Sequence, residues 1–373
     1  MRIAIEAQRI FRPNKHGMDF VALESIRELQ KLDKVNEYFI LTGPGEDTGV
    51  LQETSNFKII RINTGFYPLW EQVALPWALK KIKPDILHCT SNTAPVLGRT
   101  PLILTLHDII FLEKRRGKSK SLYQNMGWYY RKLVVPVILK KCKKIITVSK
   151  YEAEKIQNTL MLPENKLTYI YNGFGDHFYH RDDYYEVTSK YINDRDYIFF
   201  LGNTDPKKNT ERVLRSYAKY LKISDKKLPL LIADLKKEAI DTILETNGIK
   251  NISDFIRCPG YISNKDLPYV YSGAKVFLYP SLRESFGIPI LESMACGTPV
   301  ITSSVSAMPE IAGDAAITVY PESEEQIVKA LLDIENSSTL TSELVKKGME
   351  RIRDFSWKKT AEQLIKIYSE YGI

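Results

Sequence analysis

The sequence lacks the features that would place the chain in a membrane or outside the cell. It has no run of about eighteen apolar residues, so it predicts no membrane-spanning helix. Its four cysteines are scattered and have no metal-ligand spacing, which favours buried thiols in a reducing cytoplasm. Residues 1–7 indicate a short strand interrupted by Glu6 rather than a secretory signal, and no internal repeat is evident. We therefore expect a cytoplasmic protein.

Short apolar segments alternate with longer amphipathic ones twice along the chain, which predicts an α/β protein with two parallel sheets covered by helices. A length of 373 residues also suits two domains better than one. The expected strands are 2–7, 37–43, 57–62, 86–90, 102–107, 144–149, 167–172, 197–201, 228–233, 255–258, 276–280, 300–304 and 316–320. The expected helices include 18–32, 70–82, 122–141, 150–159, 209–222, 323–336, 340–353 and 356–370.

The stretch 276–304 is the most informative part of the chain. A buried strand is expected at its start, a loop follows, and Pro289 suits the first turn of a helix. In open parallel sheets, ligands bind beyond the carboxyl ends of the strands. The amides of Ser285, Phe286 and Gly287 are therefore expected at a helix N-terminus in such a position, where an anion is favoured.

Two glutamates flank this predicted anion site. Glu284 lies in the loop before the helix, and Glu292 lies one to two turns into it. One carboxylate is then expected to reach a sugar and the other a ribose, with a diphosphate on the amides between them. The alternative is a capped helix that carries two surface acids.

The segment from Glu284 to Glu292, with seven residues between its two glutamates, resembles the signature of family 4 of the retaining glycosyltransferases, which adopt the GT-B fold. Shorter matches follow the order of the family along the chain: His107-Asp108, Val148-Ser149, Tyr171-Asn172-Gly173, Gly260-Tyr261-Ile262, Tyr271-Ser272-Gly273-Ala274, residues 306–316 and Phe355-Ser356-Trp357.

The resemblance implies two Rossmann-like parallel-sheet domains that face each other across a cleft. We expect an acceptor-side domain at 1–175, completed by the C-terminal helix 356–373. Residues 176–196 are expected to form a linker, and residues 197–355 the domain that binds a nucleotide sugar.

The resemblance also assigns roles to residues outside the glutamate segment. Lys208 is expected to bind the diphosphate, although Asn203 stands where the family often has an arginine. His107 is expected at the transferred sugar, and together with Glu284 and Lys208 it forms the predicted catalytic set. The remaining residues predicted to bind the donor are Gly17, Tyr261, Ile262 and Ile288. The alternatives are a solvated lysine at 208 and a histidine at 107 that is held by local backbone.

No metal ion or cofactor is expected. Asp194-Arg195-Asp196 has the form of the Asp-x-Asp metal site of another glycosyltransferase fold, but it precedes a predicted strand instead of following one. The lysine and the helix N-terminus are expected to replace the cation.

The formal net charge of +8 is concentrated in one region. Residues 111–144 hold a single acid, Glu113, and eleven basic residues: Lys114, Arg115, Arg116, Lys118, Lys120, Arg131, Lys132, Lys140, Lys141, Lys143 and Lys144. The same stretch carries Tyr123, Trp128, Tyr129 and Tyr130, so it is expected either to lie on an anionic membrane surface or to form a solvated basic face. The membrane reading places the protein at the inner face of the plasma membrane. No nucleic-acid partner is expected.

The favoured function is retaining transfer of a hexose from a nucleotide-diphospho sugar to a glycan or lipid-linked acceptor in surface polysaccharide synthesis. The resemblance is nearest to bacterial polysaccharide mannosyltransferases that use GDP-mannose. The alternatives are a UDP-hexose donor, a GT-B sugar-nucleotide epimerase or phosphorylase, and a ligand-binding protein without activity.

Overall fold

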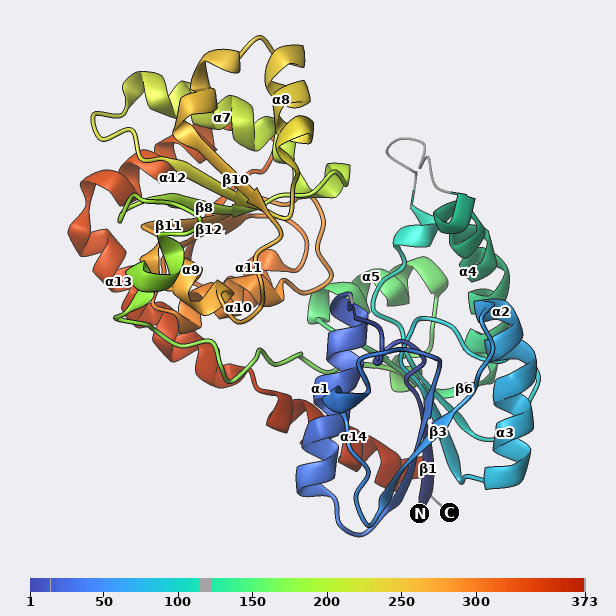
Figure 1. Cartoon of the computed structure of the whole chain (residues 1–373). Helices are drawn as coiled ribbons and strands as arrows, with labels where there is room; N and C mark the ends of the chain where they lie inside the picture. The colour runs from blue at the N-terminus through green and yellow to red at the C-terminus, as the bar shows by residue number, and fades with distance from the viewer. Residues whose placement is uncertain (14, 114–121, 372–373) are drawn as a thin grey trace. The chain divides into compact units, whose positions relative to one another are not determined.

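The computed structural model describes residues 1–13, 15–113 and 122–371 and divides the chain into two compact units (Figure 1). The first unit is Met1–Gly173 together with Ser356–Ile373, and the second is Phe174–Phe355. Each unit is built around a fully parallel sheet, so the expected pair of parallel-sheet α/β domains is confirmed.

The sheet of the first unit has seven strands in the order β3-β2-β1-β4-β5-β6-β7. Its strands are β1 (Arg2–Glu6), β2 (Glu37–Thr42), β3 (Phe57–Arg61), β4 (Ile86–Cys89), β5 (Leu102–Thr105), β6 (Cys142–Thr147) and β7 (Leu167–Tyr169). Nearly every position of β1, β4 and β5 is buried, as expected for parallel strands that are covered on both faces.

The helices of this unit cover both faces of the sheet. They are α1 (Gly17–Leu32), α2 (Tyr67–Leu69), α3 (Leu75–Ile82), α4 (Leu122–Lys141), α5 (Lys150–Leu160) and α14 (Trp357–Tyr371). One expected helix, 70–82, begins earlier and is interrupted by a π-helical turn at Trp70–Ala74. Pro76 has no N–H to return to the preceding turn, which is a local reason for the altered hydrogen-bond register.

Helix α14 belongs to the first unit although it is the last helix of the chain. It packs beside α1 (Figure 1), and its Ala361, Leu364 and Tyr368 join the apolar core formed with Ile3 and Ile5 of β1. Within the described residues, no helix of either unit is long and apolar enough to cross a membrane.

The sheet of the second unit has six strands in the order β10-β9-β8-β11-β12-β13. They are β8 (Ile198–Leu201), β9 (Leu230–Ala233), β10 (Ile256–Gly260), β11 (Val276–Tyr279), β12 (Val300–Ser303) and β13 (Ala316–Val319). Its helices are α6 (Tyr184–Thr188), α7 (Thr210–Ile223), α8 (Lys237–Thr246), α9 (Leu267–Gly273), α10 (Ile288–Ala295), α11 (Met308–Ala312), α12 (Glu324–Asn336) and α13 (Ser338–Arg351).

The stretch 176–196, expected as a linker, lies within the second unit. It contains α6, and its Thr188 and Ile192 are buried. The polar composition of this stretch masks the few apolar side chains that attach it to α9 and to the core of the unit.

The strand order of each sheet reverses next to its first strand. The reversal falls between β1 and β4 in the first unit and between β8 and β11 in the second. In open α/β sheets, the loops after such a pair of strands diverge and leave a crevice in which ligands bind. The predicted site residues Gly17, Lys208 and Glu284 all follow one of these four strands.

Candidate active site

Lys208 and Glu284 meet beyond the carboxyl ends of β8 and β11. Lys208 ends a short 3-10 turn, Pro206–Lys208, just before α7, and Glu284 lies in the loop between β11 and α10. The Lys208 ammonium donates to Glu284 Oε1 at 2.7 Å and to the hydroxyl of Tyr279 at 3.0 Å. Two residues that are 76 positions apart therefore form one polar group at the point where the strand order of the sheet reverses.

The two loops that carry this pair are bonded to each other and to a third loop. The amide of Leu282 donates to the carbonyl of Lys207 at 2.7 Å. The Ser306 hydroxyl accepts from the amide of Glu284 at 3.1 Å and donates to its carbonyl at 2.6 Å. Glu284 is thus fixed by backbone contacts before any ligand arrives, as a preorganised site requires.

Both members of the pair are charged at neutral pH. Burial by itself raises the pKa of Glu284, but the charges of Lys208 and Lys207 outweigh it and hold that pKa below 4.5. Burial lowers the pKa of Lys208, yet the neighbouring Tyr279 and Glu284 raise it above the usual value for lysine. The side chains are 21% and 14% exposed, so a ligand can still reach them.

Helix α10, whose N-terminus is the predicted anion site, begins beside this pair. Gly287 is its N-cap with φ of 105°, a left-handed conformation that favours glycine. Ile288 is the first helical residue, and Pro289 follows it in the first turn. Phe286 is buried in a T-shaped contact with Phe355, with ring centroids 5.9 Å apart. Pro289 has no N–H, and the amide of Ile290 donates to the carbonyl of Gly287 at 3.0 Å. The helix dipole favours an anion at this end of α10.

Glu292 lies further along α10, where its carboxylate accepts a hydrogen bond of 3.2 Å from the hydroxyl of Tyr271. Burial raises the pKa of Glu292 to about 7, because this hydrogen bond only partly offsets the cost of burying a charge. The two glutamates of the segment therefore differ: Glu284 is held ionised, and Glu292 titrates near neutrality.

We predict that Glu292 makes the second unit less stable as the pH rises. The pKa of Glu292 in the folded chain, about 7, exceeds the ordinary value of 4.5. The protonated side chain therefore contributes to the free energy of unfolding in full below about pH 4.5, and this contribution is lost as the pH rises through 7. The loss amounts to about 3 kcal/mol of unfolding free energy. Relative to wild type, Glu292→Gln should raise the thermal midpoint at pH 8 but not at pH 4.5. The control is Glu350→Gln on the exposed side of α13, and an equal pH dependence in all three proteins would contradict the prediction.

The other residues predicted to bind the donor on the second unit lie in different environments. Asn203 is exposed, and its side-chain oxygen accepts from the amide of Asp205 at 2.9 Å, so it stabilises its own turn. Tyr261 follows β10 and is 73% exposed, whereas Ile262 is buried in the core. Of these three, only Asn203 and Tyr261 present a side chain to solvent.

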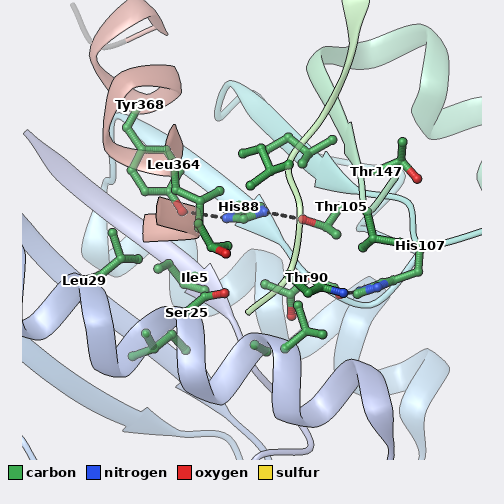
Figure 2. Close-up of a pocket in the computed structure, with 18 residues that line it drawn as sticks. Ile5, Ser25, Leu29, His88, Thr90, Thr105, His107, Thr147, Leu364 and Tyr368 are labelled. Carbon is green, nitrogen blue, oxygen red and sulfur yellow. Dashed lines mark hydrogen bonds between the residues drawn. The ribbon is translucent and has the colours of Figure 1, made fainter. Parts of the chain in front are cut away.

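His107 and Gly17 belong to the first unit. The ring of His107 is buried, and its Nε2 lies 2.9 Å from the carbonyl of Thr90 (Figure 2). A carbonyl only accepts, so Nε2 carries the proton and Nδ1 of the neutral ring is an acceptor. Burial lowers the pKa of His107, which keeps the ring neutral. Its amide donates to Asn92 Oδ1 at 2.6 Å, so the strand end that holds His107 is also fixed.

Figure 2 also shows His88, which is held between the hydroxyls of Tyr368 at 2.6 Å and Thr105 at 2.8 Å. Burial lowers its pKa to about 3, so it is a neutral structural group that ties α14 to β4. Gly17 is the first residue of α1, and a Cβ there would meet nothing within 4 Å. The fold itself therefore does not require glycine at this position.

Three contacts of the predicted site residues were not anticipated from the sequence. Tyr279 bonds Lys208, Ser306 fixes Glu284, and Tyr271 bonds Glu292. Tyr279 carried a usable signal, because a tyrosine as the last residue of a buried strand places its hydroxyl at the ligand-binding edge of the sheet. The contacts of Ser306 and Tyr271 join segments far apart in sequence and carried no local signal.

Part of the basic stretch 111–144 lies outside the described residues, including Lys114, Arg115, Arg116, Lys118 and Lys120. The rest forms α4 and the start of β6. Its aromatic side chains do not share one surface: Tyr129 is exposed, whereas Tyr130 donates to the buried carboxylate of Glu71.

Two family models match the chain. The model described as Glycosyltransferase Family 4 matches residues 16–176, and the model described as Glycosyl transferases group 1 matches residues 187–351. The two models together span most of both units.

Individual relatives agree with the family models. O-antigen chain mannosyltransferase B of Escherichia coli is 28% identical over 304 residues, which cover 78% of this chain and 76% of that protein. Sucrose-phosphate synthase of Thermosynechococcus elongatus has a similar structure, with a TM-score of 0.78, 19% identity and coverage of 99% of this chain and 98% of that one. Anabaena HepE in complex with UDP and glucose has a TM-score of 0.73 at 14% identity and covers 99% of each chain. These structural similarities concern the fold.

Proposed function

We propose, because the chain belongs to family 4 of the glycosyltransferases and has the GT-B fold, that it is a retaining hexosyltransferase that uses a nucleotide-diphospho sugar. The observation that carries this proposal is the fixed group of Lys208, Glu284 and Tyr279 beside the N-terminus of α10. It combines a cation, a carboxylate and helix amides at the ligand-binding edge of a parallel sheet.

The diphosphate of the donor would lie at the N-terminus of α10 and on Lys208. As the glycosidic bond breaks, negative charge grows on the phosphate oxygen that leaves. A fixed ammonium and helix amides stabilise that charge without reorganising, and they do so in a partly buried site where electrostatic interactions are stronger than in water. With these groups in place, we propose that transfer needs no divalent ion.

Glu284 would bind the hydroxyls of the transferred hexose, and Glu292 those of the ribose. His107 would offer its neutral Nδ1 to a sugar hydroxyl. Retention requires the new bond to form on the face that the phosphate leaves. In the route we propose, the acceptor oxygen bonds to the anomeric carbon as the carbon–phosphate oxygen bond breaks. The acceptor proton passes to the departing phosphate oxygen, which gives the glycoside and a nucleoside diphosphate.

We favour mannose from GDP-mannose as the donor and a glycan or lipid-linked acceptor in surface polysaccharide synthesis. The support is the O-antigen chain mannosyltransferase of Escherichia coli, to which the chain is similar over 78% of its length. A UDP-hexose is the second candidate, since the structurally similar HepE was solved with UDP and glucose.

A ligand panel with a turnover assay tests the proposal. A ligand that binds only the folded chain raises its thermal midpoint, so GDP and GDP-mannose should raise it more than UDP and UDP-glucose at equal concentration. GDP-mannose with an acceptor should then release GDP and form an α-linked product, and EDTA should not stop the reaction. A larger shift with the UDP ligands would support the second candidate. No shift with any nucleotide, or GDP-mannose converted without an acceptor, would contradict the proposal.

A further inference from the structure

The first unit contains a pocket of about 210 Å³ that the proposed donor chemistry does not use. Arg9, Arg12 and Arg131 line it, and we call it the arginine pocket. Tyr67 and Tyr130 form part of its wall, and none of the described residues that line it is acidic. Arg9 and Arg12 follow β1, whereas Arg131 comes from α4, so the pocket lies at the edge of the sheet where β1 ends.

Among the described residues, the three guanidinium groups of the arginine pocket form no hydrogen-bonded ion pair, although Arg9 lies near enough to Glu6 to lower its pKa. Arg9 stacks over the ring of Tyr67 at 5.0 Å, and its Nε is buried without a hydrogen-bond partner. A buried donor that is left unsatisfied costs free energy, so an acceptor on a ligand would offset that cost.

The wall of the pocket is built around a buried carboxylate whose oxygens already accept hydrogen bonds from neighbouring side chains. Glu71 is fully buried and accepts from the hydroxyls of Tyr67, at 2.6 Å, and of Thr93 and Tyr130. Burial and this carboxylate raise the pKa of Tyr67 well above its usual value, so its hydroxyl stays protonated. Glu71 thus holds the two tyrosine rings in place and does not neutralise the arginines.

A second buried acid, Glu6, lies near Arg9. Burial raises the pKa of Glu6, although Arg9 opposes that rise. Its carboxylate accepts from the amides of Gln8 at 3.0 Å and Thr90 at 3.2 Å. These contacts leave the arginine pocket with a positive lining over an inner layer of satisfied acids.

We propose that the arginine pocket binds a phosphate or diphosphate group carried by the acceptor. This inference rests on the proposed transferase function and names the chemistry of its second substrate. Guanidinium groups bind phosphate oxygens with two parallel hydrogen bonds, and three of them around one pocket match a diphosphate better than a neutral glycan. A neutral acceptor would leave the Nε of Arg9 without a partner.

The surface around the pocket favours a lipid as the carrier of that phosphate. Helix α4 exposes apolar side chains at the spacing of one helix face: Met126, Tyr129, Leu133 and Val137. The segment from α2 to α3 exposes another such row: Phe66, Leu69, Val73 and Trp77. Tyr67 of α2 and Tyr130 of α4 both line the pocket, so these two rows belong to the helices that border it. Apolar rows beside basic groups suit the surface of a bilayer.

Calorimetric titration of inorganic pyrophosphate and of farnesyl diphosphate tests the inference. The parent protein is Lys208→Ala, so that the phosphate site proposed on the second unit contributes little. Adding Arg12→Gln and Arg131→Gln should weaken binding of both probes about tenfold or more, because each change removes a charge-assisted pair of hydrogen bonds. Adding Lys140→Gln, which removes one exposed charge of the same helix outside the pocket, should leave both affinities unchanged.

Tighter binding of farnesyl diphosphate than of pyrophosphate identifies a lipid headgroup, and equal binding identifies a phosphate without a lipid. If the combined variant does not fold, the single change Arg131→Gln replaces it in the titrations, and circular dichroism checks that this variant is folded. Arginine variants that bind both probes like the parent would overturn the inference, as would a parent that binds neither. The difference in GDP affinity between wild type and Lys208→Ala is measured separately and reports on the donor site, because the arginine pocket is the same in both proteins.

Discussion

Replacing Lys208 with alanine should lower kcat/KM for hexose transfer by about 100- to 1,000-fold, measured as nucleotide release in the presence of acceptor. The magnitude is that of removing one preorganised group that stabilises a developing anion. Most of the loss should appear in kcat, because the charge on the phosphate is greatest in the transition state. Lys222→Ala, an exposed lysine on α7, is the matched control and should behave as wild type.

The same substitution should also destabilise the second unit, since it leaves Glu284 partly buried without its cation. Removing one partner of a buried pair costs about 3 kcal/mol. The double variant Lys208→Ala, Glu284→Gln removes both charges and should regain most of that stability while staying inactive. Recovery of activity together with stability in this double variant would contradict a catalytic role for both residues.

Replacing Glu284 with glutamine should reduce kcat by about 100-fold or more while GDP still binds. Glutamine keeps the size of the side chain and one acceptor, but it loses the negative charge that pairs with Lys208. An ammonium released from this pair is available to the diphosphate, so the affinity for GDP should be kept or increased. Loss of transfer with retained or tighter nucleotide binding is therefore the expected signature.

The matched control for this second variant is Glu325→Gln, an exposed carboxylate at the start of α12. It should leave both kcat and the affinity for GDP unchanged. A Glu284→Gln enzyme that turns over at the rate of wild type would remove Glu284 from the site. Equal losses in transfer and in GDP affinity would assign it to donor binding alone.

The sequence predicted the features that depend on neighbouring residues. The strand, loop and helix around Glu284 were predictable because Pro289 and Gly287 constrain the start of α10. The family resemblance assigns Lys208 to the diphosphate, and its place after a strand and a turn that precede α7 was predictable from the local sequence. The direct bond between Lys208 and Glu284 was not predicted, because it depends on β8 and β11 pairing in the sheet.

The arginine pocket is a second example of a feature that could not be predicted from neighbouring residues. Arg131 stands in a basic stretch that its composition predicts to form one surface, yet consecutive residues of a helix point about 100° apart. Tyr129 therefore faces solvent while Tyr130 and Arg131 line the pocket. Arg9 and Arg12 come from the opposite end of the first unit's sequence, and no local pattern relates them to α4.

The return of α14 to the first unit determines when that unit can be completed. On the ribosome, all of residues 174–355 are made before Ala361, Leu364 and Tyr368 emerge. Until then the apolar cluster of α1 and β1 lacks the side chains that α14 contributes, and His88 has no tyrosine hydroxyl. The first unit, whose translation starts before that of the second, is thus the unit whose core is completed last.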